Sequence, residues 1–333
     1  MRALTGSLVL ALAGCGSPGD DSSTAAGSTT SGSTTSGSTS GSTGAAPTTS
    51  GDASTGAATT GDASTDASTT GGEVGGCNGH VALCGRRFDE VVFPMTHNSF
   101  SAKEAGFSQI NANQVHPVAT QLADGVRGLM LDVELSGEEV ILCHGPCLLG
   151  QLSHVDILAD IADFLADNPR EIVTIIYQDS APVDAIAADL AAAGLDQLAF
   201  TYAGGPFPTL GEMIDADTRL VVTAEVGGPP PAWFHHVWDL TWDTPYTWHS
   251  VDEFSCALNR GAQVNPLFLI NHWLSTDLDL PSEEGAKQVN VYDVLYARAV
   301  GCMQETGDLP NFIGVDFYNY GDLFAVVDAL NGV

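Results

Sequence analysis

Strand and helix patterns alternate along residues 77–333 of this 333-residue chain, and no other feature of the sequence restricts the fold as strongly. Short apolar runs typical of buried strands recur, and between them lie segments whose apolar residues repeat at helical spacing. This alternation predicts a parallel sheet with crossover helices. Seven or eight such units within these residues predict one α/β domain, a closed but irregular (β/α) barrel.

The expected elements follow from these patterns. Apolar residues from Val155 to Leu165 recur at helical spacing, and Asn168 with Pro169 ends that helix. The segment 229–248, rich in Pro and Trp, fits no regular element and is expected to form a long loop over one end of the barrel. The predicted strands are 91–95, 128–133, 140–143, 171–177, 219–226, 267–271 and 313–318. The predicted helices are 155–165, 183–193, 296–306 and 321–330.

Residues 1–15 have the pattern of a secretory signal. Arg2 precedes a short apolar core at 8–12, which is too short for a membrane-spanning helix of roughly 20 residues. The segment ends in Leu-Ala-Gly-Cys, a lipoprotein-type cleavage box, so we predict that Cys15 becomes a lipidated amino terminus. An ordinary signal peptide with a chance cysteine is the alternative. Either interpretation predicts an extracytoplasmic protein, anchored to a bacterial membrane by lipid or secreted.

Residues 16–76 consist almost entirely of Ser, Thr, Gly, Ala and Asp, with near-repeats such as GSTTSGSTTSG. Such a composition cannot bury enough apolar surface to offset the entropy of ordering the chain. We therefore predict a disordered linker whose root-mean-square reach is roughly 40–45 Å. Residues 77–333 would then form the folded domain.

Six cysteines remain when Cys15 is set aside, and an even number in a secreted chain indicates disulfides. The first two and the next two are close enough in sequence to close small loops, which leaves the last two for each other. Six cysteines allow 15 pairings, so this pairing is one of several possibilities. A zinc site built from Cys143, His144 and Cys147 is the rival interpretation. The predicted pairs are Cys77 with Cys84, Cys143 with Cys147, and Cys256 with Cys302.

The chain is strongly acidic. One basic and six acidic residues precede Cys77, so residues 77–333 carry 9 basic and 35 acidic groups, a net charge of −26. Such a surface repels nucleic acid, and we exclude nucleic acid as a partner. It also repels anionic membranes unless cations intervene. Much of this acidity is also typical of a salt-exposed secreted protein.

Polar side chains follow three of the predicted strands. His97 and Asn98 come after 91–95, His144 follows 140–143, and Asp132 lies near the end of 128–133. Reactive groups gather at the carboxyl ends of parallel strands. Two histidines and a carboxylate on neighbouring strand ends therefore predict one acid–base site. Two core histidines bonded to backbone carbonyls are the alternative. His272, which also ends a strand-like run, is a weaker candidate.

These residues lie within motifs that resemble the phosphatidylinositol-specific phospholipase C X-domain family, in particular its smaller secreted branch. The motifs are THNSF at 96–100, GVRGLMLDVE at 125–134, LCHG at 142–145, CNGHVALC at 77–84, NPREIVTII at 168–176 and NFIGVDFY at 311–318. The resemblance implies a distorted TIM-type (β/α)8 barrel. It also implies that His97 is the general base and His144 the general acid of phosphodiester cleavage.

Oxygen ligands near the predicted site favour Ca²⁺ or Mg²⁺ over a soft metal. Asn98 and Asp132 match the calcium-dependent members of the family, and Gln178 stands where another carboxylate is expected. Glu134 points to the same side of its strand as Asp132 and could supply a further ligand. We therefore predict a calcium site with a reduced ligand set. The alternative is that Asp132 only orients His144 or bonds a nearby arginine.

The resemblance also implies substrate contacts. Asp316 and Tyr318 match a family pair that contacts inositol, with the aromatic ring stacked on the sugar. Arg127 belongs to the second motif and is a further candidate for binding substrate, although a place behind the sheet is the alternative. Two lysines and seven arginines are the only basic residues of 77–333, which argues against multiply phosphorylated inositides as substrates.

The function predicted from these features is an extracytoplasmic phosphodiesterase, a phospholipase C that releases a cyclic inositol phosphate and diacylglycerol from an inositol lipid. The expected partners are the phospholipid substrate and a membrane surface reached through the lipid anchor, and the expected state is a monomer. One alternative is a barrel that binds a polyol or glycan without turnover, which Met130 and Gln178 favour because carboxylates are expected there. Another is a hydrolase of a different phosphodiester.

Overall fold

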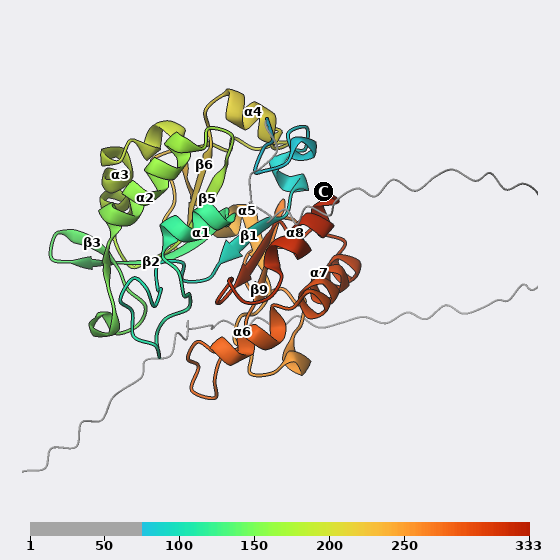
Figure 1. Ribbon diagram of the computed structural model, residues 1–333. Coiled ribbons are helices and arrows are strands. Elements are labelled where there is room, and N and C mark those ends of the chain that lie inside the picture. The colour runs from blue at the N-terminus through green and yellow to red at the C-terminus, as the bar shows by residue number, and fades with distance from the viewer. Residues whose placement is uncertain (1–74) are drawn as a thin grey trace, which may run out of the picture. The chain divides into compact units, whose positions relative to one another are not determined.

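The computed structural model describes residues 75–333 (Figure 1). The predicted signal peptide, the lipidation site Cys15 and almost all of the predicted linker lie outside the described residues. None of the described helices is long and apolar enough to cross a membrane.

Eight parallel strands form one curled sheet in the order β7-β6-β5-β2-β1-β10-β9-β8. No pairing joins β7 to β8 within 75–333, so the sheet stays open between them. The distorted TIM-type fold is therefore confirmed, whereas hydrogen-bonded closure is not observed. The strands are β1 (Phe93–Thr96), β2 (Gly128–Ser136), β5 (Val173–Asp179), β6 (Leu220–Ala224), β7 (Phe234–His236), β8 (Thr241–Asp243), β9 (Leu267–His272) and β10 (Phe312–Val315).

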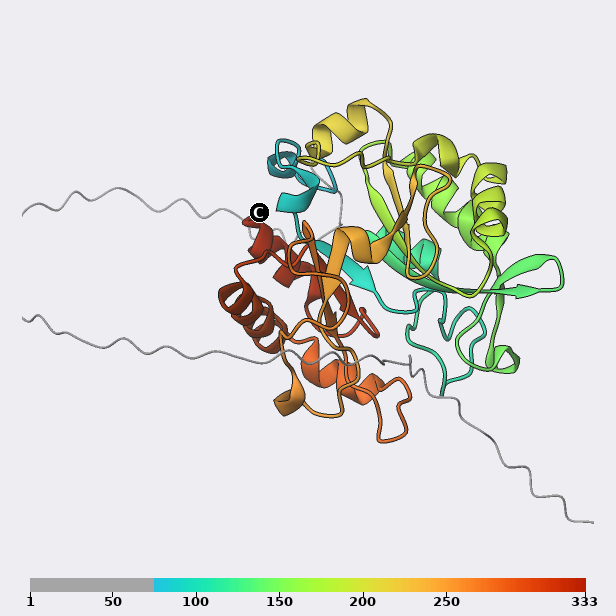
Figure 2. The ribbon, with the colours of Figure 1, turned by 180° about the vertical axis from the view of Figure 1, so that it is seen from behind.

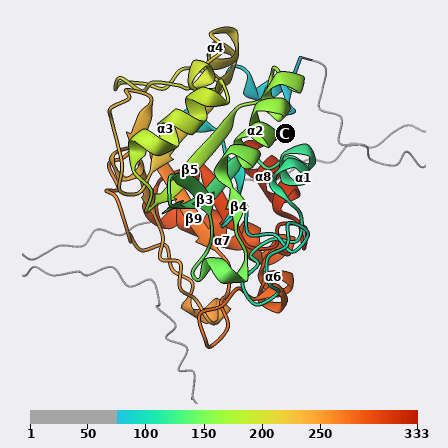
Figure 3. The same cartoon turned by 90° about the vertical axis from the view of Figure 1, so that its left-hand side faces the viewer.

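Helices cover the outer face of the sheet, and Figure 3 shows α2 and α3 beside β5. The buried residues of α2 repeat at helical spacing, and the helix ends at Asp167, next to Asn168 and Pro169 as predicted. The helices are α1 (Val118–Asp124), α2 (His154–Asp167), α3 (Val183–Ala192), α4 (Leu210–Asp215), α5 (Val237–Leu240), α6 (Glu283–Val289), α7 (Tyr292–Thr306) and α8 (Leu323–Asn331).

Strand side chains alternate between two apolar layers, as the pleat requires. Leu129 and Leu131 of β2 pack in the layer between the sheet and the helices. Phe93 and Met95 of β1 belong to a second cluster, which includes Phe312 of β10 and lies on the other face of the sheet. Burial on both faces explains why these strands are nearly continuous apolar runs.

The expected strand at 140–143 lies outside the run of eight parallel strands, which corrects the parallel arrangement predicted for it. β2 runs past the barrel and pairs antiparallel with β3 (Glu139–Leu142), with Val133 opposite Leu142. β3 also pairs antiparallel with β4 (Leu152–Ser153), and the arm projects at the left of Figure 1. Because β3 runs back along β2, its end returns to the carboxyl end of the barrel.

The segment 229–248 was expected to be a long loop, and this prediction is wrong. It contains β7, α5 and β8, which lie in the orange part of the ribbon seen from behind (Figure 2). The two strands have three residues each and the helix has four. Elements this short do not complete a recognisable hydrophobic period, so the sequence pattern missed them.

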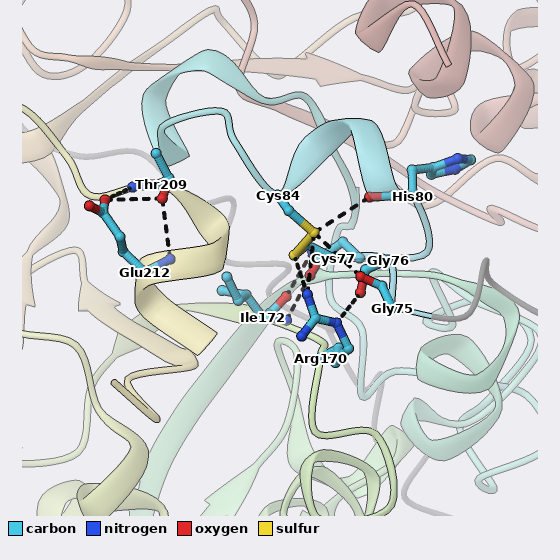
Figure 4. Close-up of a disulfide and its surroundings, with 10 residues drawn as sticks. Gly75, Gly76, Cys77, His80, Cys84, Arg170, Ile172, Thr209 and Glu212 are labelled. Carbon is cyan, nitrogen blue, oxygen red and sulfur yellow. Dashed lines mark hydrogen bonds between the residues drawn. A yellow bond between two sulfur atoms is a disulfide. The ribbon is translucent and has the colours of Figure 1, made fainter. Parts of the chain in front are cut away.

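The three predicted disulfides are confirmed, with Cα–Cα distances of 5.1–5.2 Å. Figure 4 shows the Cys77–Cys84 bond with the Arg170 guanidinium turned toward both sulfur atoms. Asn78 exchanges two hydrogen bonds with Ile172, the residue before β5. This disulfide therefore lies at the amino ends of the strands, opposite the end where the polar residues follow β1 and β2.

Candidate active site

His97 follows the carboxyl end of β1, and side chains from other segments hold its ring. Its Nδ1 atom lies 2.9 Å from Oδ1 of Asp316, which follows β10. Asn113 donates a hydrogen bond of 3.0 Å to the same carboxylate oxygen. The imidazole stacks on Trp273, with ring centroids 4.0 Å apart and planes 4° from parallel. Asp316 is 1% exposed, so the protein shields the carboxylate side of the pair.

The turn after β1 fixes the position of His97. Asn98 has a φ of 44°, in the left-handed region that asparagine adopts more readily than most residues. Ser99 then binds Met130 of β2 twice, donating its backbone N–H at 2.9 Å and accepting at Oγ at 3.0 Å. Gln114 donates to the His97 carbonyl at 2.8 Å. The turn is thus fastened to the neighbouring strand.

This arrangement decides which ring nitrogen of His97 carries the proton. A carboxylate only accepts hydrogen bonds, so Nδ1 donates to Asp316 and Nε2 keeps its lone pair. The Asn98 amide lies 3.3 Å from Nε2, a long contact. A partly exposed imidazole with an oriented, unprotonated Nε2 has the properties of a general base.

His144 lies in the connection after β3, and its ring meets the His97 ring edge to face. The ring centroids are 6.4 Å apart and the planes are inclined by 72°. Each ring nitrogen can reach about 3 Å, so both rings can contact one phosphodiester group. Burial, and secondarily the charge of His97, lowers the pKa of His144 to about 4. Its Nδ1 atom is buried and has no hydrogen-bond partner within residues 75–333.

Three side chains at the carboxyl ends of β1, β2 and β5 bring polar atoms within 3.2 Å of one another. The amides of Asn98 and Gln178 each place one atom 3.0 Å from Oδ1 and 3.2 Å from Oδ2 of Asp132. The Asn98 nitrogen donates to Oδ1 of Asn113 at 3.2 Å, so the Asn98 oxygen faces Asp132. Rotating that amide would bring the Asn98 and Asn113 oxygens to 3.2 Å instead. Gln178 is exposed and can present either end.

Converging oxygens require a proton or a cation between them. Burial raises the pKa of the Asp132 carboxyl to about 7; the charge of His97 opposes this shift, and the charges of Glu225 and Glu134 reinforce it. A protonated carboxyl can donate to one amide oxygen. A hard divalent cation can bind all of these oxygens, because Ca²⁺ prefers carboxylate and amide ligands. The three side chains present therefore fit the predicted calcium site.

Glu134, the fourth predicted ligand, lies apart from these oxygens. Its Oε2 atom is 3.7 Å from the sulfur of Cys147, beside the Cys143–Cys147 disulfide. It makes no hydrogen bond to Asp132 in the described part of the chain. The disulfide also removes the two thiolates on which the rival zinc site depended.

Arg127 lies at the opposite end of the sheet, which corrects its prediction as a substrate-binding residue. It precedes β2, and its guanidinium donates to Glu171 at 2.7 Å and to the carbonyls of Leu122 and Val126. Because parallel strands share one polarity, a residue before β2 cannot join groups that follow β1. Arg127 fastens the amino end of β2 to the segments around it.

Of the pair Asp316 and Tyr318, only the aspartate reaches the site. Asp316 contacts Nδ1 of His97, a position from which it can orient the imidazole. Tyr318 is 3% exposed, packs in the main core, and donates its hydroxyl to Asp124 at 2.6 Å. Its predicted stacking on a sugar is corrected, because β10 ends at Val315 and the chain turns away at Phe317, whose φ is 48°.

The sequence interpretation missed Asn113 and Trp273, which contact the His97–Asp316 pair. Trp273 directly follows His272, so the strand end singled out as a weaker candidate does supply a site residue, one position later. His272 itself is fully buried: its Nε2 bonds the Val289 carbonyl at 2.9 Å, and burial lowers its pKa to about 3. Asn113 lies in a loop without any periodic signal.

A charged group that the sequence interpretation missed lines the same end of the sheet. Glu225 follows β6 and Asp243 ends β8, and Arg260 binds them at 2.8 Å and 2.6 Å. The Arg260 guanidinium also lies over the rings of Trp238 and Tyr246, at 4.2 Å and 4.7 Å from their centroids. Glu225 is close enough to affect the pKa of Asp132, so the group adjoins the oxygen cluster.

The fold and the site together define a TIM-type barrel with paired histidines at the carboxyl ends of its strands. Residues 83–331 match the family PI-PLC X 1. The chain belongs to this PI-PLC X family, whose resemblance the motifs indicated.

Similar sequences occur in a plant and a fungus. The chain is 30% identical over 282 residues to a PI-PLC X domain-containing protein of Arabidopsis thaliana, covering 74% of this chain and 63% of that protein. It is 27% identical over 289 residues to a secreted protein of Arthroderma benhamiae, covering 77% and 64%. The chain thus spans less than two thirds of these relatives.

Solved structures support the fold. The phosphatidylinositol-specific phospholipase C of Listeria monocytogenes aligns with a TM-score of 0.51 at 16% identity, over 75% of this chain and 94% of that one. A mutant of the Staphylococcus aureus enzyme aligns with a TM-score of 0.53 at 14% identity, over 74% and 95%. At such identities the likeness shows the fold alone.

Proposed function

We propose that this protein is a phosphodiesterase of the phospholipase C type, which cleaves an inositol lipid by attack of a neighbouring hydroxyl on phosphorus. The observation that carries the proposal is the His97–Asp316 pair, 6.4 Å from the ring of His144. One imidazole has an oriented lone pair and the second stands across the same site. Attack of a neighbouring hydroxyl on phosphorus needs a base for that hydroxyl and an acid for the leaving oxygen.

The chemistry assigned to the two histidines follows from their environments. Nε2 of His97 takes the proton of the attacking hydroxyl, and Asp316 stabilises the imidazolium that forms. His144, in its protonated form, gives a proton to the leaving oxygen as the second P–O bond breaks. Its low pKa disfavours that form in the free protein, and the negative charge of a bound phosphodiester raises the pKa.

The proposed metal site consists of Asn98, Asp132 and Gln178. A Ca²⁺ ion held there would supply positive charge against the negative charge that develops on the non-bridging phosphate oxygens. With one carboxylate among three ligands, its affinity is expected in the high micromolar to millimolar range. Glu134 is close enough to increase the local negative charge without a direct bond.

The proposed headgroup carries hydroxyls and no additional phosphates. Glu225 is partly exposed beside the oxygen cluster, Asp243 is fully buried, and Arg260 is bound to both. Carboxylates accept hydrogen bonds from hydroxyls and repel phosphates. This charge pattern favours phosphatidylinositol or a glycosylated relative.

Phosphorus NMR of the products tests this proposal. Incubation with phosphatidylinositol is expected to yield a cyclic inositol phosphate first, and His97→Ala and His144→Ala are each expected to reduce its formation by roughly 10²–10⁴-fold. A non-cyclic phosphate as the first product would instead support simple hydrolysis of a phosphodiester. Binding of inositol without any new phosphorus signal would support the non-catalytic barrel.

The proposed location is outside the cytoplasm, with Cys15 lipidated and the domain tethered by the Ser/Thr/Gly-rich segment. The relative from Arthroderma benhamiae that is named a secreted protein supports export. Mass spectrometry of the mature amino terminus would detect acyl chains on Cys15 and so test the anchor.

A further inference from the structure

The two candidate catalytic histidines are supported in different ways. The His97 ring is held by Asp316 and Trp273, and Asn113 donates a hydrogen bond to the same aspartate. The His144 ring has no such hydrogen bond in the described residues, and its buried Nδ1 lacks a partner. A general acid must nevertheless be held in place, because misplacement by about 1 Å can cost about 10²-fold in rate. The position of His144 therefore depends on its backbone.

That backbone is closed into a small ring. His144 lies between Cys143 and Cys147, whose disulfide joins Cα atoms 5.1 Å apart across a sequence separation of four. Cys143 directly follows β3 and is 1% exposed, so one end of the ring is anchored in the protein. Residues 143–146 have no regular secondary structure that could hold them otherwise. Asn111 adds one bond, donating to the His144 carbonyl at 2.8 Å.

We propose that the Cys143–Cys147 disulfide is a positioning element of the active site, which holds His144 where it can protonate the leaving oxygen. This inference rests on the proposed function, since it assumes that His144 is the general acid. A disulfide that closes so short a loop removes little entropy from the unfolded chain. Its main effect is therefore expected on the reaction rather than on global stability.

The structure offers a matched control. The Cys77–Cys84 disulfide also closes a short loop, with a sequence separation of seven and the same Cα–Cα distance of 5.1 Å. It lies at the amino ends of the strands, beside Arg170, and contacts neither histidine of the site (Figure 4). Removing it tests what the loss of a small disulfide does by itself.

The experiment compares two leaving groups in the variant Cys143→Ser/Cys147→Ser. Phosphatidylinositol releases an alkoxide, which needs a proton, whereas the 4-nitrophenyl ester of inositol phosphate releases a stable phenolate. We expect kcat to fall by about 10²-fold for phosphatidylinositol and by only a few fold for the nitrophenyl ester. The variant Cys77→Ser/Cys84→Ser should keep the wild-type ratio of the two rates.

A double-mutant cycle separates positioning from general damage. Once His144→Ala has removed the acid, adding the two serine substitutions should cost no further rate with phosphatidylinositol. If the two serine substitutions slow both substrates equally, or slow the His144→Ala protein by a further large factor, the disulfide does not act through His144 and the inference is overturned.

The test also distinguishes this inference from the proposed function. Full activity of His144→Ala would overturn the proposed acid itself, and the inference with it. If His144→Ala loses activity while Cys143→Ser/Cys147→Ser stays fully active, only the role of the disulfide is overturned. If Cys143→Ser/Cys147→Ser fails to fold, the same comparison can be made by reducing this disulfide in the folded wild-type protein with a dithiol. Mass mapping of the freed thiols shows which bond was reduced. Reoxidation should then restore the rate.

Discussion

Two histidine–aspartate pairs in this molecule have nearly the same geometry and opposite surroundings. His97 Nδ1 lies 2.9 Å from Asp316 at the carboxyl end of the sheet, where 23% of the histidine side chain is exposed. His154 Nδ1 lies 2.8 Å from Asp189 behind β5, where none of the histidine side chain is exposed. In both pairs a carboxylate fixes the same ring nitrogen.

The second ring nitrogen distinguishes the two pairs. Nε2 of His154 is 2.9 Å from the hydroxyl of Tyr177, so both ring nitrogens are satisfied inside the core. Burial lowers the pKa of His154, which keeps the ring neutral. Nε2 of His97 has no hydroxyl or carbonyl partner within 75–333, and 23% of the side chain is exposed. The difference teaches that a histidine–carboxylate pair becomes a candidate base only when its other nitrogen is left for a substrate.

The largest expected effect is on catalysis at the first pair. His97→Ala should reduce turnover of phosphatidylinositol by roughly 10²–10⁴-fold, because it removes the proton acceptor, while the circular dichroism spectrum stays unchanged. His154→Ala, assayed at a temperature where it remains folded, should keep kcat close to wild type. Equal losses of kcat in the two variants would remove the distinction between the pairs.

The His154–Asp189 pair should contribute more to the free energy of unfolding than the His97–Asp316 pair. His154→Ala leaves the buried hydroxyl of Tyr177 without its partner and creates a cavity, so we expect the free energy of unfolding to fall by about 3 kcal/mol. Urea denaturation measures this loss. His97→Ala is the control and should lose less than about 1 kcal/mol, since its side chain is partly exposed. A smaller loss for His154→Ala than for His97→Ala would contradict this assignment.

The two aspartates provide a sharper version of the comparison. Asp316→Asn replaces the acceptor of the Nδ1 proton by an amide that can also donate, so the imidazole loses its fixed tautomer. We expect kcat to fall by about 10-fold to 10²-fold, with a smaller change in KM. Asp189→Asn makes the same chemical change beside the buried His154 and should leave both constants unaltered. An unaffected kcat in Asp316→Asn would show that the carboxylate is not needed to orient His97.

Removal of metal should affect only the region of the first pair. Chelation is expected to abolish turnover, and Ca²⁺ at ten times its dissociation constant should stabilise the wild-type protein by about 1.4 kcal/mol. Asp132→Asn should weaken this stabilisation at the same Ca²⁺ concentration, whereas Asp189→Asn should retain it in thermal scans. Undiminished activity in excess chelator, with protein shown by elemental analysis to be metal-free, would require another cation at the site.

The smallest expected effect is a pH dependence of stability from the second pair. The folded-state pKa of His154 is lowered from 6.5, so its contribution to stability is present above pH 6.5 and is lost as the pH falls toward the folded-state value. The melting temperature of the wild-type protein should therefore fall more steeply between pH 7 and pH 5 than that of His154→Ala. Parallel curves for the two proteins would rule out this histidine as the source.

Long elements and their order were predictable from the sequence. The helix pattern from Val155 to Leu165 and the apolar run of β5 span enough residues to show their periods. The motifs around His97, His144 and Asp132 indicate the family from the sequence alone. β7 and β8, with three residues each, were not predictable because such short segments contain less than a full pattern.

The sequence by itself determined the fold class and the histidines at the site, because each depends on local pattern or on motifs; it favoured the disulfide pairs without excluding other pairings. Only the tertiary structure decided that His144 arrives on an antiparallel arm, that Asp316 holds His97, and that Arg127 and Tyr318 point elsewhere. These outcomes depend on register and polarity between segments distant in sequence. Asp316 and His97 are 219 positions apart, yet their side chains are bonded because β1 and β10 pair in parallel register.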